Sequence, residues 1–582
     1  MVIGISIGTK SIVCFNYRTT PDGIVIGCIS NPITVPAAIS CIDGSIRCGQ
    51  KALNCQEGHQ HVLLNVKRLL GKQLNTIKSL SSVNVSCCRL VDTPDGIAMR
   101  VFDPKDITNA TDIIVTSCMT QILENAIEQV IGDTMPLSSV NAVVTYPLGP
   151  DQRIMKEIDK SMEEMKVGHY QLLPKSAAIA MAYFHWHPEE MEDQSYLVYS
   201  FGGGMFETSM VQFSRNKINL CSYDGNTALG GIDIDNVILK YVISQLMRDT
   251  PSIALDVNGR YKLIAICEKA KEELSQREST VIDLQDYVHG KTVTLSRKQF
   301  NQLIKPIVDE TITMTQNLAL KWKRIHPNMQ PIGILLAGGS SEIPFVRERL
   351  IETIGLSTVS TIPVCNVAAE GCCEYARKPT QIVSEATVGI AIEIEGQLHT
   401  IIPRGVTIGT NQTLKVTLEA IDNIIIIPVY AVPKEAAAYR IGQIRIPNYS
   451  DETEWKLLFT ATYSHDGDIE MSVTTREGNA MPLVLQITQV ALDFHMTDIP
   501  INSTKTNELN SPQKQQIFIR IRNAINRLKV MKEENSTITN GNELDEDIAK
   551  LKAIRSETRS AHMDQLEDIE RQLLQVEEKY QC

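Results

Sequence analysis

The sequence lacks the features that would place a protein in a membrane or in the secretory pathway. Its 582 residues contain no apolar run long enough to span a bilayer. The N-terminal residues, MVIGISIGT, form a strand-like pattern without a basic segment or a cleavage site, so we expect no signal peptide. The C-terminal residues, EEKYQC, match no retention or lipidation motif. These absences favour a cytoplasmic protein that acts without a membrane.

An excess of positive charge is also absent. The formal net charge is −12 at pH 7, which argues against nucleic acids or anionic membranes as general partners. The 14 cysteines include no CxxC pair, so the spacing that converging zinc ligands require is missing. We therefore predict buried, reduced thiols and no metal site built from cysteine.

The chain is long enough for about three or four domains, and its pattern changes twice along its length. Residues 1–378 alternate strand-like and helix-like segments, which predicts an α/β domain. Residues 386–505 carry short alternating strands separated by turns, which predicts an all-β domain. Residues 510–582 carry apolar residues at helical spacing, which predicts an amphipathic helical segment. Residues 379–385 are the expected interdomain linker.

Glycine-rich turns are the most informative local feature. VIGISIGTKSIVCFNY (2–17) and YLVYSFGGGMFETSMVQF (196–213) each have the pattern of strand, glycine turn and strand. The repeated hairpin predicts two related lobes with a cleft between them. Glycine permits a tight turn and lets a phosphate approach the backbone N–H groups. One such turn alone would be an ordinary tight turn. The two hairpin turns and the glycine turn at 338–340, taken together, favour phosphate binding.

The order of these segments resembles the 70-kDa heat-shock chaperone family, with local matches from Gly4 to about Thr488. Any one motif alone would be weak, and the shared order makes the resemblance specific. The matching motifs are GISIGTKS (4–11), VKRLLG (66–71), VVTYP (143–147), SFGGGMFETS (200–209), TALGGIDID (227–235), CEKAKEELS (267–275) and LAGGSSEIP (336–344).

The resemblance implies a fold with three parts and a function. An actin-like, two-lobed nucleotide-binding domain would cover residues 1–378, a β-sandwich substrate-binding domain residues 386–505, and a short α-helical lid residues 510–582. Such a protein is a molecular chaperone that binds exposed hydrophobic segments of unfolded polypeptides under the control of ATP or ADP. J-domain co-chaperones, exchange factors or another chaperone would be its protein partners.

The resemblance also assigns candidate site residues. Lys67, Thr9 and Glu207 take the places of catalytic groups. The residues expected to bind nucleotide are Gly8, Thr9, Lys10, Gly202, Gly203, Gly204, Gly230, Gly231, Glu268, Lys271, Ser275, Gly338, Gly339 and Ser340. The residues expected to line the peptide-binding groove are Ile390, Ile392, Ile425 and Ile427, although alternation predicts that about half of the run 424–427 belongs to a core strand.

Several charged groups of the family's site are replaced in this chain. Ser6 and Ser200 stand where the family has aspartates, so the carboxylates that attract Mg²⁺ are lost. Lys10 replaces a threonine and adds a positive charge beside the phosphates. Glu272 and Glu342 replace arginines that would stack on adenine. We therefore expect weak or lost ATP hydrolysis and weakened adenine affinity, and we do not expect a Mg²⁺ site.

Two other classes of function fit parts of the sequence. A non-enzymatic scaffold or exchange-factor-like regulator of another chaperone would use the same fold without the chemistry. A sugar or metabolite kinase would share the actin-like cleft, but the β domain and the helical tail have no role in such an enzyme.

Overall fold

The structure is a computed structural model that describes most of the chain up to Ile487. The predicted helical lid at 510–582 and the end of the predicted β domain at 488–505 lie outside the described residues, apart from four isolated positions. The described residues are 1–19, 25–26, 32–42, 45–54, 62–75, 88–103, 106–132, 135–148, 153–187, 194–214, 217–249, 255, 257–326, 329–359, 364–386, 388–419, 424–433, 437–447, 454–464, 468–475, 478–487, 547, 550, 571 and 572.

The described residues divide into two compact units. Unit 1 runs from Met1 to Ser384, and unit 2 begins at Glu385. Within the part of the chain that the structure describes, no helix is both long and apolar enough to cross a membrane.

A six-stranded sheet forms the core of the N-terminal half of unit 1. Its central strand β1 (Val2–Ile7) pairs in parallel with β11 (Asn141–Tyr146) and antiparallel with β2 (Ser11–Thr19). Every residue of β1 after Val2 is buried, as expected for the middle strand of a sheet that is covered on both faces. The remaining strands are β12 (His169–Pro174), β3 (Val25–Ile26) and β4 (Ile33–Pro36).

A second six-stranded sheet in unit 1 repeats this plan. Its strand β13 (Ser195–Phe201) pairs in parallel with β18 (Ile334–Ala337) and antiparallel with β14 (Phe206–Ser214). Both hairpins predicted from the sequence are therefore present, each with a parallel strand beside its first strand. The outer strands are β15 (Lys217–Asn226), β19 (Thr358–Val359) and β20 (Gln381–Val383).

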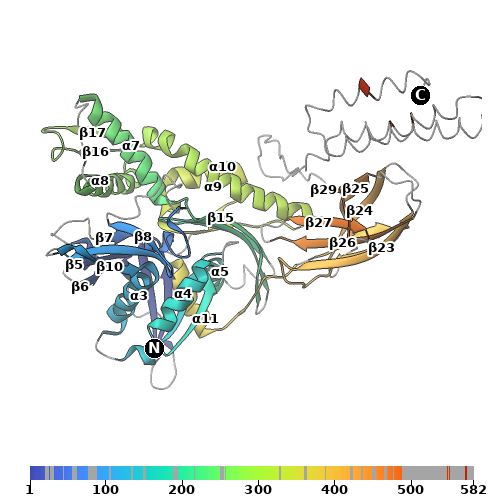
Figure 1. Cartoon of the computed structure of the whole chain (residues 1–582), viewed down its shortest axis with the longest axis horizontal. Helices are drawn as coiled ribbons and strands as arrows, with labels where there is room; N and C mark the ends of the chain where they lie inside the picture. Colours follow the sequence, from blue (N-terminus) through green and yellow to red (C-terminus); the bar gives the residue numbers. More distant parts are fainter. Residues whose placement is uncertain are drawn as a thin grey trace, which may run out of the picture. The chain divides into compact units, whose positions relative to one another are not determined.

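Smaller sheets and helices complete unit 1. Figure 1 shows β16 and β17 beside α7 and α8 at one end of the unit. The strands are β5 (Ala38–Ile42), β6 (Ser45–Cys48), β7 (Val62–Leu64), β8 (Arg89–Thr93), β9 (Gly96–Asp103), β10 (Asp106–Ile114), β16 (Ser279–Asp283) and β17 (Thr292–Ser296). The helices are α1 (Gln50–Leu53), η2 (Val66–Arg68), α3 (Val115–Ile131), η4 (Leu137–Ser139), α4 (Arg153–Glu164), α5 (Lys175–Trp186), α7 (Gly231–Asp249), α8 (Val257–Gln276), α9 (Arg297–Ile325), η5 (Gly339–Glu342), α10 (Pro344–Ile354) and α11 (Val367–Arg377).

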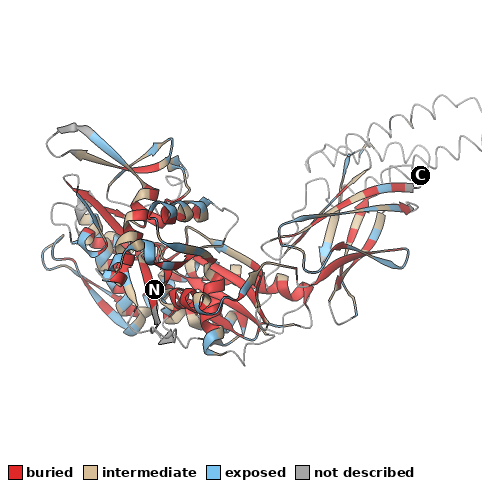
Figure 2. Ribbon diagram, turned by 90° about the horizontal axis from the view of Figure 1, so that it is seen from below, coloured by how far each residue is buried: buried red, intermediate tan, exposed pale blue. Residues whose placement is uncertain are grey.

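Two helices, α5 and α11, connect the two large sheets. The helix α5 is apolar on all sides and buried from Ser176 to Tyr183, because it packs against α11 and against strands of both sheets. The α5–α11 contact is so close that a Cβ atom on Gly371 would lie 1.7 Å from the carbonyl oxygen of Ala178. The inner strands and helices of unit 1 are accordingly buried along most of their length (Figure 2).

Unit 2 contains two antiparallel sheets. One has the strand order β22-β21-β24-β25-β29 and the other β23-β26-β27-β28. An all-β domain was predicted here, and the described residues from 388 to 487 contain strands and their connections only. The strands are β21 (Gly389–Ile394), β22 (Gln397–Ile402), β23 (Asn411–Glu419), β24 (Ile424–Val432), β25 (Tyr439–Pro447), β26 (Glu454–Tyr463), β27 (Ile469–Thr475), β28 (Ala480–Met481) and β29 (Val484–Ile487).

The close contact at Gly371 generates a stability prediction. We expect Gly371→Ala to destabilise unit 1 by about 3 kcal/mol, because the added methyl group overlaps backbone of a helix that is fixed between two sheets. The measurement is thermal unfolding followed by circular dichroism. Gly339→Ala is the control, since no described atom lies within 4 Å of a Cβ there. Equal melting temperatures for the two variants would contradict the packing argument.

Candidate functional site

The turns of the two hairpins pack directly on each other. A Cβ atom on Gly204 would lie 2.4 Å from Cγ2 of Thr9, so only glycine allows this approach. A Cβ atom on Gly203 would lie 2.7 Å from Cγ of Lys10. The side chains of the first turn thus cover the backbone of the second.

Two further glycine segments join these turns. The amide of Gly231, at the start of α7, donates a hydrogen bond of 3.0 Å to the carbonyl of Gly202. The hydroxyl of Ser340 donates to the same carbonyl at 3.1 Å. Gly338 has a φ of 82° and its Cα faces the carbonyl of Phe201, where a Cβ atom would lie 2.5 Å away. We call the region formed by residues 8–10, 202–204, 230–231 and 338–340 the glycine-turn site.

Several backbone N–H groups of the glycine-turn site have no hydrogen-bond acceptor within the part of the chain that the structure describes. Among the described residues, no group accepts a hydrogen bond from the amides of Thr9, Lys10, Gly203 or Gly204. Clustered N–H groups of this kind form anion-binding sites. The glycines predicted to bind phosphate are therefore brought together, and their binding role stays a prediction.

Lys67 is buried beside the first hairpin. It lies in η2, and its Nζ donates a hydrogen bond of 2.6 Å to the carbonyl of Ile7. Burial lowers the pKa of the Lys67 ammonium to about 7, and the charge of neighbouring Lys175 adds to this effect. Lys67 therefore changes its charge near neutral pH.

Glu207 is the one acid of the second hairpin and is also buried. Its Oε1 accepts hydrogen bonds from the Ser176 hydroxyl at 2.8 Å and from the Leu148 amide at 3.4 Å. Burial raises the pKa of Glu207, while Lys175, the Ser176 hydroxyl and Lys67 act in the opposite direction. The charge of Glu207 thus interacts with those of both lysines.

The second of these lysines, Lys175, escaped the sequence-based prediction. It is the first residue of α5, and its Nζ lies 4.0 Å from the position of a Cβ atom on Gly202. Burial lowers its pKa, and Glu207 opposes that shift. The sequence shows a single lysine at the start of the apolar segment KSAAIAMAYF. Nothing in that pattern indicates the direction of the lysine side chain.

The two serines that replace the family's acids are buried. Ser200 is fully buried, its hydroxyl has no partner among the described residues, and it pairs across the hairpin with Glu207. Ser6 is 6% exposed. In the part of the chain that the structure describes, no three His, Cys, Asp or Glu side chains are grouped to hold a metal ion. The residues present beside the turns do not fit Mg²⁺, because Ser6 and Ser200 are neutral and the nearby Lys67 and Lys175 cannot act as metal ligands while they are protonated.

Glu268, Lys271 and Ser275 of α8 would face the ribose and base of a nucleotide by the family resemblance, and they form a network with Lys10 and Asp235. The Lys10 ammonium lies 2.9 Å from Oε2 of Glu268 and 3.7 Å from Oδ2 of Asp235. Lys271 binds Asp235 at 2.7 Å, and Ser275 donates to the Lys271 carbonyl at 3.1 Å. Lys10, expected to contact phosphate, is thus placed against two acids.

The pKa values of the two acids in this network, Asp235 and Glu268, shift in opposite directions. Burial raises the pKa of Asp235 despite the nearby Lys271 and Lys10. Burial also acts on Glu268, but there the ammonium groups of Lys10 and Lys271 outweigh it and lower the pKa. Glu268 is therefore held as a carboxylate.

The adenine side has no stacking cation from the two predicted positions. Glu272 and Glu342 are both exposed. Partial desolvation of the Glu272 carboxyl and the charge of neighbouring Glu268 raise the pKa of Glu272. Exposure fits the simpler interpretation that both are solvated surface charges.

A second ion pair, between Arg68 and Asp233, was not predicted. Arg68 Nη2 lies 2.6 Å from Asp233 Oδ2, and Arg68 Nε donates to the Gly204 carbonyl at 2.8 Å. Asp233 also accepts from the Gly230 amide at 2.7 Å. These contacts tie η2 to the second turn and to the start of α7.

The four isoleucines predicted to bind peptide lie in β21 and β24 of unit 2. Ile390 and Ile392 are fully buried and Ile427 is 2% exposed, whereas Ile425 is partly exposed. Three of the four side chains are thus part of the core, and a groove role for the set stays a prediction.

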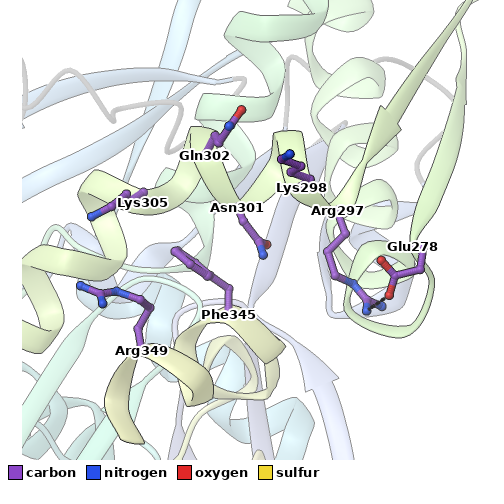
Figure 3. A pocket seen from close by; sticks show the side chains of 8 residues that line it. All are labelled: Glu278, Arg297, Lys298, Asn301, Gln302, Lys305, Phe345 and Arg349. Atoms are coloured by element: carbon purple, nitrogen blue, oxygen red, sulfur yellow. Dashed lines mark hydrogen bonds and ion pairs between the residues drawn. The ribbon is translucent and has the colours of Figure 1, made fainter. Parts of the chain in front are cut away.

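A pocket of about 440 Å³ lies away from the glycine-turn site, between the start of α9 and α10 (Figure 3). Figure 3 shows Phe345 and Asn301 pointing into it. Its basic residues are mostly paired: Arg297 binds Glu278 at 2.5 Å, and Arg349 binds Asp309 at 3.1 Å. The pocket therefore offers little uncompensated charge to an anion.

Comparison with known proteins identifies the family. A family model described as Hsp70 protein matches residues 2–427. A chaperone protein HscA homolog of Haemophilus influenzae is 24% identical over 529 residues, covering 88% of this chain and 81% of the relative. HscA homologs of Bordetella petrii and Methylobacillus flagellatus are 25% and 23% identical, each over 70% of this chain and 64% of the relative. The resemblance inferred from the motifs is confirmed, and the chain belongs to the Hsp70 family of chaperones.

Proposed function

We propose that this protein is a chaperone that binds extended hydrophobic segments of other polypeptides and holds ATP or ADP without a metal ion. Hydrolysis at its site is slow or absent. The observation that carries the proposal is the position of two buried lysines beside the glycine turns: Lys67 donates to the Ile7 carbonyl, and Lys175 lies beside Gly202.

The glycine-turn site fits a phosphate chain. The uncommitted amides of Thr9, Lys10, Gly203 and Gly204 are donors that suit anionic oxygens. Lys175, beside Gly202, supplies the positive charge that a metal ion would otherwise supply. A nucleotide bound here would contribute its phosphate chain as the group that the lysines and amides bind.

The same residues do not support rapid hydrolysis. Transfer of a phosphoryl group needs a positioned water molecule and neutralisation of the charge that develops on the phosphate oxygens. Ser6 and Ser200 are neutral and cannot anchor Mg²⁺ for this purpose. Any residual turnover would use Lys67 for charge and Thr9 and Glu207 to position water.

The peptide-binding half of the proposal is supported by family membership and by β24. Extended peptides bind through backbone hydrogen bonds, with pockets for alternate apolar side chains. Ile425 is partly exposed and shares a strand face with buried Ile427, so a bound side chain would reach Ile425 first.

Partners and location follow from the resemblance as proposals. J-domain co-chaperones and exchange factors are the proposed regulators, and the cytoplasm is the proposed compartment. A scaffold that regulates another chaperone is the alternative if no ligand binds to either unit.

Peptide binding tests the chaperone function. We expect a fluorescein-labelled, apolar, extended peptide to show saturable anisotropy changes, and Ile425→Lys to weaken binding about tenfold. Ile426→Lys is the matched control, because Ile426 is 51% exposed on the opposite face of the same strand. Equal losses in both variants would argue against a groove at Ile425.

A melting scan tests metal-free nucleotide binding. We expect saturating ATP to raise the melting temperature equally in EDTA and in Mg²⁺, since a ligand at 100 times its Kd stabilises by about 2.7 kcal/mol. A rise only with Mg²⁺, or brisk Mg²⁺-dependent phosphate release by purified protein, would refute the proposal. A flat result under both conditions would favour the scaffold.

The pKa of Lys67 predicts a pH dependence. Because this pKa is about 7, Lys67 is charged at pH 6 and mostly neutral at pH 8, so phosphate binding loses one attraction as pH rises. We expect the ratio of wild-type to Lys67→Met affinity for ADP to fall roughly fivefold from pH 6 to pH 8. The phosphates of ADP also titrate, but this affects both proteins equally and cancels in the ratio of their affinities. A constant ratio would show that Lys67 does not contact the phosphates as a cation.

A further inference from the structure

Lys10 reaches across the glycine-turn site. It leaves the first hairpin turn, lies over Gly203 and places its ammonium 2.9 Å from Glu268 of α8. The two residues are separated by 258 positions in the sequence. Their contact joins the N-terminal hairpin to the helix whose residues resemble the family's ribose partners.

The side chains of this ion-pair network differ in how far they are buried. Asp235 is 1% exposed and Lys271 is 12% exposed, so their pair forms the inner part. Lys10 and Glu268 are 32% and 33% exposed and form the outer part. Lys10 is therefore the member that can leave while the inner pair stays intact.

The same contacts engage the groups that a ribose would need. The carboxylate of Glu268 already accepts a hydrogen bond from Lys10. The ammonium of Lys271 is already paired with Asp235. A ribose hydroxyl could bind these groups only by displacing charged partners, and hydrogen bonds between charged groups are stronger than those to a neutral hydroxyl.

We propose that Lys10 acts as an internal competitor for the ribose subsite, so that this site recognises the phosphate chain of its ligand and not the nucleoside. The inference rests on the proposed function, because it concerns the same ligand site. The ligand class that it names is linear polyphosphate, with or without a nucleoside attached. The exposed Glu272 and Glu342 agree with this, since neither offers a cation to stack on a base.

The test compares two ligands at Lys10 variants. Affinities for ATP and for inorganic tripolyphosphate are measured in EDTA by titration calorimetry on the full chain. We expect the wild type to bind both within about threefold of each other, and Lys10→Met to raise the preference for ATP about tenfold. Using the ratio removes any general loss of phosphate affinity that follows from deleting a positive charge.

Two further variants make the comparison specific. Lys10→Thr is expected to give the same gain, so the result does not depend on one variant folding well. The control is Lys269→Met, on the same helix as Glu268. It removes an ammonium group that is 77% exposed and 3.9 Å from Glu273, so it should leave the ratio of ATP affinity to tripolyphosphate affinity unchanged.

Each outcome decides between the ideas. More than about threefold preference for ATP in the wild type, or an unchanged ratio in both Lys10 variants, would overturn the inference and leave phosphate binding intact. Failure of both ligands to bind the wild type would overturn the proposed function and the inference with it.

Discussion

The close approach of two glycine turns is the constraint on which the rest of unit 1 depends. Thr9 of the first hairpin occupies space that any side chain at position 204 would need. This contact brings the ends of β1 and β13, which belong to different sheets, to one place. The charged residues of η2, α5, α7 and α8 then meet around the same backbone, so the site is a consequence of how the sheets pack.

The charges collected there differ from those that a metal-dependent ATPase needs. Lysines lie beside the turns, serines occupy the buried strand positions, and Asp233, Asp235 and Glu268 are ion-paired. A chain of the Hsp70 family can therefore keep the glycine turns while the charged residues around them change. This arrangement of charge is the basis of the proposal that the site binds an anion and does not hydrolyse it rapidly.

Local sequence patterns predicted the secondary structure well and the contacts between distant side chains poorly. Both hairpins and the change to an all-β segment follow from glycine turns and from the spacing of apolar residues. The contacts of Lys10 with Glu268 and of Arg68 with Asp233 join residues far apart in sequence, and no periodicity encodes them. Lys175 is a similar case, because its direction depends on how the start of α5 meets the second hairpin. The predicted lid lies outside the described residues.

One packing contact has a consequence for biosynthesis. Gly4 of β1 lies against α11, where its amide donates to the Sγ of Cys373, 369 residues later in the chain. At ribosomal rates of about 5–20 residues per second, the first strand waits roughly 20–70 s before its covering helix has been translated. During that interval the mostly apolar strand β1 lacks its contact with α11. Nascent unit 1 is therefore itself a candidate client for the chaperones that guard emerging polypeptides.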